Sequence, residues 1–207
     1  MFFLFPALVF AQGSVEEAYI NTLKKRSDKI VDQLGISDQD LKMEVRDIIV
    51  DQYRALSAIR DARDAAIDSL KTASPDKQNE EKIKAIENAA GVELCMLHRS
   101  FIGKLSARLT PGQVDGVKNG MTYNVMPVTY QGFLEMLPDL TDEQKKQIMA
   151  YLWEAREHAI DAGSSEEKHW WFGKYKGKIN IYLSNAGYDL KKASKEWQER
   201  LKSQNSK

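Results

Sequence analysis

The chain has 207 residues, 43% of them hydrophobic, which is enough to bury a full core in one domain. Lysine and arginine together number 30 and are balanced by 30 aspartate and glutamate residues, so the formal net charge is zero. This balance excludes a uniformly basic surface, and we predict no nucleic-acid partner.

The first residues, MFFLFPALVFAQGS, form an apolar run that is too short to span a bilayer. Val9 and Ala11 place small residues at the positions that a signal peptidase reads before Gln12. We predict that residues 1–11 are the remnant of a signal peptide, that residues 12–207 are a single periplasmic or secreted domain, and that it does not insert into a membrane after cleavage. The alternative is a buried N-terminal apolar segment.

Residues 14–109 predict one helix followed by a long antiparallel helical hairpin. Ser14 and Glu17 form a capping box at the start of the first helix, and Gly35 is its stop. Residues 36–40 open the next helix, whose apolar positions recur at spacings of three and four. The Ser-Pro-Asp sequence at 74–76 predicts the turn between the two arms.

Three polar side chains and one thiol of the hairpin carry specific predictions. Counting through the turn places Glu93 near Arg60 and Arg63, so we predict an interhelical ion pair that fixes the register of the arms. Cys95 has no partner for an internal disulfide and lies between Leu94 and Leu97, so we expect a small buried hydrophobe; the alternative is a reactive thiol or an intermolecular bridge.

Residues 110–207 predict a C-terminal helical lobe. Thr110 with Gln113, and Thr141 with Gln144, are two helix starts with the same Leu-Thr-x-x-Gln spelling. Helices are expected from the first start to Gly120, over 130–137, from the second start to Gly163, from 164 to near Gly187, and from 188 onward, with a loop over 123–129. No strand pattern competes with this reading. The predicted class is all-α without a significant sheet.

The two Leu-Thr-x-x-Gln strings resemble those of periplasmic LTxxQ-motif chaperones, small all-α proteins that bind unfolded clients on a concave surface. The physical content of the string is only a capped helix start, so its specificity is low. The resemblance implies an ATP-independent chaperone or stress protein as an alternative function, with unfolded protein as the partner.

The segment AREHAIDAGSSEEKHWWFGKYKGKINIYL is the densest in unusual side chains. Trp171 and Tyr175 fall at helical spacing and are most simply core residues. Gly173 and Gly177 lie one turn apart on another stripe, and each interior glycine costs a helix roughly 1 kcal/mol relative to alanine. We expect the close approach of another backbone there. The sharper alternative is a ligand groove in which a sugar ring stacks on Trp170 and an acidic group meets Lys174, Lys176 or Lys178.

Glu154, His158 and Asp161 lie about one turn apart on the preceding helix and are a weak candidate set for a divalent metal. Surface ion pairs are the simpler interpretation, so we expect neither a metal nor another cofactor. No pair of carboxylates and no nucleophile motif can be picked out for catalysis, so an enzyme is the less favoured class.

Three long strings, RDIIVDQYRALSAIRDARD, LTPGQVDGVKNGMTYNVMPVTYQGFLEMLP and the aromatic segment above, together resemble the bacterial exported family known as domain of unknown function 3826. The resemblance covers nearly the whole mature chain and implies no site residue. It implies export, a single domain and an accessory role in extracellular polysaccharide use. Together with Trp170 and the neighbouring lysines, it makes a non-enzymatic binding or accessory protein the leading expectation, with an acidic glycan as the partner. An uncharacterised glycan-active enzyme is a further alternative. The oligomeric state stays open.

Overall fold

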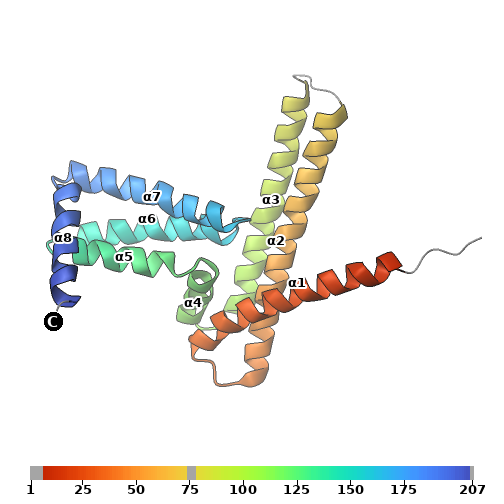
Figure 1. Cartoon of the computed structure of the whole chain (residues 1–207), viewed down its shortest axis with the longest axis horizontal. Coiled ribbons are helices and arrows are strands. Elements are labelled where there is room, and N and C mark those ends of the chain that lie inside the picture. Colours follow the sequence, from red (N-terminus) through yellow and green to blue (C-terminus); the bar gives the residue numbers. More distant parts are fainter. Residues whose placement is uncertain (1–6, 74–77, 206–207) are drawn as a thin grey trace, which may run out of the picture. The chain divides into compact units, whose positions relative to one another are not determined.

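The structure, a computed structural model, describes residues 7–73 and 78–205. Every regular element in these ranges is a helix, so the predicted all-α class is confirmed (Figure 1). The chain divides between Val117 and Lys118 into two compact units. This boundary lies inside a helix, whereas the sequence places the start of the C-terminal lobe at residue 110. No helix of the described ranges has the length and apolarity that crossing a membrane requires.

The first unit is built around the predicted hairpin. It contains α1 (Ala7–Val31), the short 3-10 helix η1 (Asp32–Leu34), α2 (Gln39–Ala73) and α3 (Gln78–Ser106). The arms α2 and α3 run side by side, and α1 packs against α2 (Figure 1). The predicted turn at 74–76 lies outside the described residues. The buried apolar side chains of this unit come from all three long helices and include Leu23, Ile30, Val45, Ile49, Leu56, Phe101 and Leu105.

Local signals place most helix ends in this unit. Gly35 closes η1 with a φ of 66°, a left-handed conformation that glycine adopts without steric cost. The Oδ1 atom of Asp38 accepts hydrogen bonds from the backbone N–H groups of Asp40 and Leu41 and caps α2. The predicted start at Ser14 is wrong, because α1 already begins at Ala7. The residues before Ser14 include good helix formers, and their propensity outweighs one capping signal.

The interhelical ion pair of Glu93 with Arg60 and Arg63 stays a prediction. Arg63 forms an ion pair with Asp64, its neighbour on α2, where Nη2 lies 2.7 Å from Oδ1, and Glu93 is exposed on α3. The prediction for Cys95 is wrong, because this residue is exposed rather than buried. The stripe of α3 that faces α2 passes through Leu94 and Leu97 instead, which turns the residue between them outward.

The second unit is a layer of antiparallel helices. The end of α4 (Pro111–Met121) leads into α5 (Val125–Met136), α6 (Asp142–Ile160), α7 (Ser165–Asn185) and α8 (Leu190–Asn205). In Figure 1, α6 lies between α5 and α7, and α8 crosses the ends of these helices. The core of the unit is formed by apolar residues that these helices turn toward one another, including Phe133, Ile148, Leu152, Ala155, Phe172, Ile179 and Leu183.

One predicted loop is part of a helix. Residues 123–129 were expected to be irregular because of Pro127, but α5 begins at Val125. Pro127 therefore lies in the first turn, where a backbone N–H has no partner inside the helix and its loss costs little. Tyr123 and Asn124 make the sharp connection from α4, with φ values of 58° and 55°.

Both Leu-Thr-x-x-Gln strings form reciprocal caps that also hold a second segment. The Thr141 hydroxyl accepts from the Gln144 backbone, and the Gln144 side chain accepts from the Thr141 backbone. The Tyr188 hydroxyl donates to Oε1 of Gln144 at 2.9 Å. At the first string, Gln113 caps Thr110 and donates from Nε2 to the carbonyl of Leu34. Each string thus has a structural role.

Candidate functional site

Residues 170–175 of the aromatic segment lie in the first half of α7, and their aromatic side chains differ in burial. Tyr175 is 3% exposed and belongs to the core, while Trp171 is half-buried and packs against that core. Trp170 is 56% exposed. An exposed tryptophan is unusual because its burial from water is favourable, so Trp170 marks this surface as a candidate binding site.

The contacts described for the rings of the two tryptophans are packing contacts, and none of them is a hydrogen bond. Trp171 stacks on His158 of α6, with ring centroids 4.2 Å apart and planes 12° from parallel. Trp170 meets the edge of Trp171 at a centroid distance of 4.9 Å and an angle of 78°. Trp171 therefore anchors the pair, and Trp170 extends from it into solvent.

Two lysines lie over aromatic rings of α7. Nζ of Lys174 is 5.2 Å from the centroid of Trp170 and 4.8 Å from that of Trp171. Nζ of Lys178 is 4.0 Å from the centroid of Tyr175. The cation–π contact of Lys174 holds its ammonium group beside the exposed indole, and that of Lys178 holds its ammonium group over Tyr175. We call Trp170, Trp171, Lys174, Tyr175 and Lys178 the aromatic–lysine face.

The two glycines of α7 border this face and are uncovered. A Cβ atom added at Gly173 or Gly177 would meet no atom of the described chain within 4 Å. The expected close approach of another backbone is therefore absent there, and a flat, open strip runs along α7 beside Trp170. Such a strip lets an extended ligand reach the helix backbone, which a side chain would otherwise cover.

The beginning of α7 is fixed by local capping and by one buried lysine. The Ser164 hydroxyl accepts from the Glu167 backbone at 3.1 Å. Nζ of Lys168, a residue only 5% exposed, donates to the carbonyl of Met121 at 3.1 Å. The pKa of Glu166 is lowered, first by its own backbone N–H and then by the Ser164 hydroxyl. These contacts pre-order the turn that carries the tryptophans.

His169 lies just before Trp170 and is also held in place. Its ring stacks on Tyr123 with centroids 5.7 Å apart, and its Nδ1 is 2.7 Å from the Ser165 carbonyl. A second aromatic pair therefore borders the aromatic–lysine face on the side of the turn between α6 and α7.

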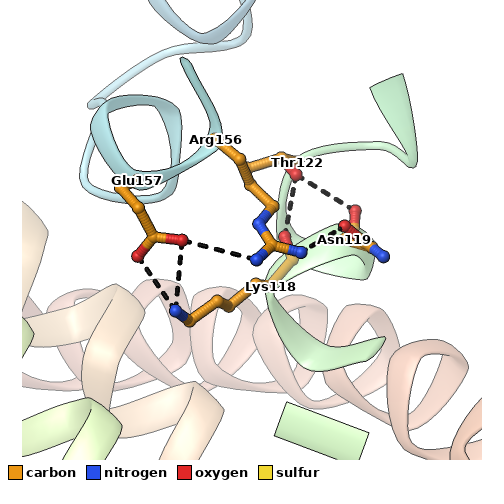
Figure 2. A network of polar contacts seen from close by, with 5 residues as sticks. All are labelled: Lys118, Asn119, Thr122, Arg156 and Glu157. Carbon is orange, nitrogen blue, oxygen red and sulfur yellow. Dashed lines mark hydrogen bonds and ion pairs between the residues drawn. The ribbon is translucent and has the colours of Figure 1, made fainter. Parts of the chain in front are cut away.

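A polar network that the sequence analysis missed lies where α4 and α6 meet (Figure 2). Nζ of Lys118 is 2.9 Å from Oε2 of Glu157, and Nη1 of Arg156 donates to Oδ1 of Asn119 at 2.9 Å. Nη2 of Arg156 lies 3.5 Å from Oε1 of Glu157, and the Thr122 hydroxyl donates to the Lys118 carbonyl. Arg156 is 3% exposed. The sequence does contain a signal for the burial of Arg156, because this residue follows Leu152 by one turn on the apolar stripe of α6.

The composition of this network indicates a structural role. Its side chains pair with one another and with backbone groups, and a buried arginine must be compensated in this way because an unpaired charge is costly to bury. The network is therefore a support for the end of α6 that carries His158.

The weak metal candidates do not converge. Among the described residues, no group of three or more histidine, cysteine, aspartate or glutamate side chains is arranged to hold an ion. His158 is used in the stack with Trp171. Glu154 lies near Tyr175, whose pKa is raised first by burial and then by this carboxylate.

The aromatic–lysine face presents an indole surface, two ammonium groups and an open backbone strip. An indole is suited to stacking on another ring, and ammonium groups attract anions.

Comparison with known proteins gives one assignment. No curated protein matches the chain. The model of a family described as a protein of unknown function, DUF3826, matches residues 20–203 and so spans both units. The chain belongs to the DUF3826 family.

Proposed function

We propose that this chain is an exported, non-enzymatic binding protein for acidic carbohydrate, which it recognises on the aromatic–lysine face. The exposure of Trp170 beside Lys174 carries the proposal. A sugar ring presents a face of C–H groups that packs on an indole, and a carboxylate on that ring would draw the ammonium group away from the indole.

The lysines favour an acidic over a neutral ligand. Three lysines of α7, at 174, 176 and 178, follow Trp170 within about two turns. A neutral polymer would gain only hydrogen bonds from the ammonium groups to its hydroxyls, whereas a uronic-acid polymer carries one carboxylate on each ring and would gain stronger, charge-assisted contacts. The Gly173–Gly177 strip would give such a polymer room to extend along the helix.

The test is a binding titration of the purified protein with polygalacturonate and alginate, with dextran as the neutral polymer. We expect binding to the acidic polymers and loss of at least tenfold in affinity, about 1.4 kcal/mol, in Trp170→Ala. Trp197→Phe is the matched control, because Trp197 belongs to α8 and packs toward Gly132. No binding to either acidic polymer would reject the proposal.

The proposed compartment has its own test. We propose that the chain is periplasmic or secreted, because the run before Gln12 has the length of the apolar region of a signal peptide and ends in its small-residue pattern. Sequencing the N-terminus of the protein recovered from cell fractions should give Gln12 as the first residue. Recovery of the intact chain from the cytoplasm would reject the proposed compartment.

A chaperone of the LTxxQ type is the second candidate, and one observation favours it. Val92 and Met96, one turn apart on α3, are 61% and 67% exposed. Exposed apolar side chains of this size can hold unfolded segments. Suppression of the aggregation of a reduced, unfolded test protein without ATP would support this candidate, and Val92→Ser with Met96→Ser should then abolish it.

A further inference from the structure

A groove between α5 and α6 contains Trp153, a tryptophan that does not belong to the aromatic–lysine face. It is open to solvent, has a volume of about 400 Å³ and is lined from α5 by Tyr130 and from α6 by Asp142, Lys145, Lys146, Met149 and Trp153. Its volume lies within the range of small-molecule sites.

The groove follows directly from the spacing of α6. Asp142, Lys145, Met149 and Trp153 recur at intervals of three and four, so they form one stripe of the helix beside α5. Trp153 follows Leu152, a fully buried core residue, and is therefore turned away from the core. It is 51% exposed. The stripe thus joins an aromatic platform at one end to charged groups at the other.

The charges of the groove specify the class of ligand. Nζ of Lys145 lies 3.4 Å from Oδ1 of Asp142. Both side chains are exposed, so water weakens the attraction between them. Lys146 is exposed beside it. Two ammonium groups against one carboxylate give the groove a net positive charge, and Asp142 can accept hydrogen bonds from hydroxyl groups. Trp153, Tyr130 and Met149 provide the apolar wall on which a ring would pack.

We infer that this groove is a second binding site, which takes one carboxylate-bearing sugar ring with its face on Trp153 and its carboxylate toward Lys146 and Lys145. The site shares its ligand class with the proposed function but none of its residues. The two sites are therefore independent, and a polymer with many acidic rings could engage both at once with a gain in avidity.

The test uses the side-chain N–H signals of the four tryptophans in the ¹⁵N-labelled full-length protein. Trp153→Phe and Trp170→Phe assign the two signals that matter and keep an aromatic ring at each position. The probe is trigalacturonate, with maltotriose as the neutral trisaccharide. We expect trigalacturonate to shift the Trp153 signal saturably, both in the native protein and in Trp170→Phe.

The charge requirement is tested with a pair of double variants. Lys145→Ala with Lys146→Ala should weaken the titration of the Trp153 signal at least fivefold. Lys191→Ala with Lys192→Ala makes the same change of charge on α8 and should leave it unchanged. A dispersed spectrum of each variant verifies that it is folded, and Lys146→Gln alone, expected to weaken binding at least twofold, is the milder replacement if the double variant does not fold.

Each outcome assigns the two sites separately. If only the Trp170 signal moves, the second site is rejected and the proposed function stands. If only the Trp153 signal moves, the second site stands and the proposed role of the aromatic–lysine face is rejected. If neither moves, both are rejected. Equal shifts of Trp153 with maltotriose, or a double-lysine variant that titrates like the native protein, would overturn the assignment of an acidic ligand.

Discussion

The indole of Trp171 lies flat against the imidazole of His158, with the ring centroids 4.2 Å apart. This contact joins α7 to the end of α6 and takes the more buried of two adjacent tryptophans into the packing of the unit. Trp170, one residue earlier, points about 100° away on the helix and stays exposed. Two neighbouring residues of the same type therefore have different expected roles.

Replacement of Trp171 by alanine should destabilise the protein without involving a ligand. A fully buried tryptophan costs about 3–5 kcal/mol when truncated, and Trp171 is half-buried, so we expect about 2 kcal/mol. Trp170→Ala should change the free energy of unfolding by no more than about 0.5 kcal/mol. Urea denaturation followed by circular dichroism measures both. Equal losses in the two variants would contradict the assignment.

Replacement of Gly173 and Gly177 by alanine should stabilise α7. Both positions are helical and open, so each change should raise the free energy of unfolding by about 0.5–1 kcal/mol. The added methyl groups would also protrude from the strip beside Trp170, where we propose that the polymer extends. The affinity for an acidic polymer should therefore fall.

Gly103→Ala, at an equally open helical position of α3, is the control for the glycine variants. It should give a similar stabilisation and leave binding unchanged. Destabilisation by Gly173→Ala or Gly177→Ala would instead indicate a close backbone contact at α7.

The polar network of Figure 2 should be sensitive to the loss of one negative charge. Glu157→Gln keeps the shape of the side chain but leaves Lys118 and Arg156, whose side chains are 14% and 4% exposed, without that charge. Breaking a buried ion pair costs about 3–5 kcal/mol, and since Glu157 is itself 38% exposed we expect about 1–2 kcal/mol. Glu199→Gln, at an exposed position of α8, should cost far less. Thermal unfolding distinguishes the two.

Removal of the Tyr188 hydroxyl should destabilise the helix start at the second Leu-Thr-x-x-Gln string. This hydroxyl is within hydrogen-bond distance of Oε1 of Gln144 and the Asp139 carbonyl, so Tyr188→Phe should cost about 1 kcal/mol. Tyr182→Phe in the same unit is the control, because the described contacts of that side chain are ring packing. A larger effect at Tyr182 would show that the hydroxyl of Tyr188 is not the stabilising group.

We predict that the protein loses stability in alkaline solution as Tyr175 ionises. Burial, followed by the nearby Glu154 carboxylate, raises the pKa of its phenol above the ordinary value of about 10. The folded state therefore favours the neutral phenol, and its contribution is complete below pH 10. As the pH rises through the raised pKa, the unfolded chain ionises more readily and the native protein should lose stability relative to Tyr175→Phe. Parallel stability curves for the two proteins up to pH 11 would contradict this.

Helix boundaries were the most predictable features of the chain. The caps at Thr110, Thr141 and Ser164 and the stop at Gly35 depend on hydrogen bonds or backbone angles within about four residues, and the sequence contains all of that information. The start of α5 was missed for the same local reason, since Pro127 is compatible with a first turn as well as with a loop.

Contacts between elements were much less predictable. The sequence pattern predicts Glu93 as a partner for Arg63, and the structure adds an ion pair of Arg63 with Asp64, one residue away on the same helix. Cys95, Trp153 and Arg156 were likewise placed by the rotation of a helix against its neighbour. A rotation of about 100° separates adjacent positions, so a small uncertainty in the packed face exchanges buried and exposed residues.

The sequence by itself determined an all-α chain, its capped helices and the concentration of aromatic and basic residues in α7, because periodicity, capping and composition are local properties. Only the tertiary structure decided which tryptophan is anchored and which is exposed, that the two glycines are uncovered, and that Trp153 and Tyr130 line one groove. These are properties of pairs of helices, fixed by the free energy of burying one face of each helix against another.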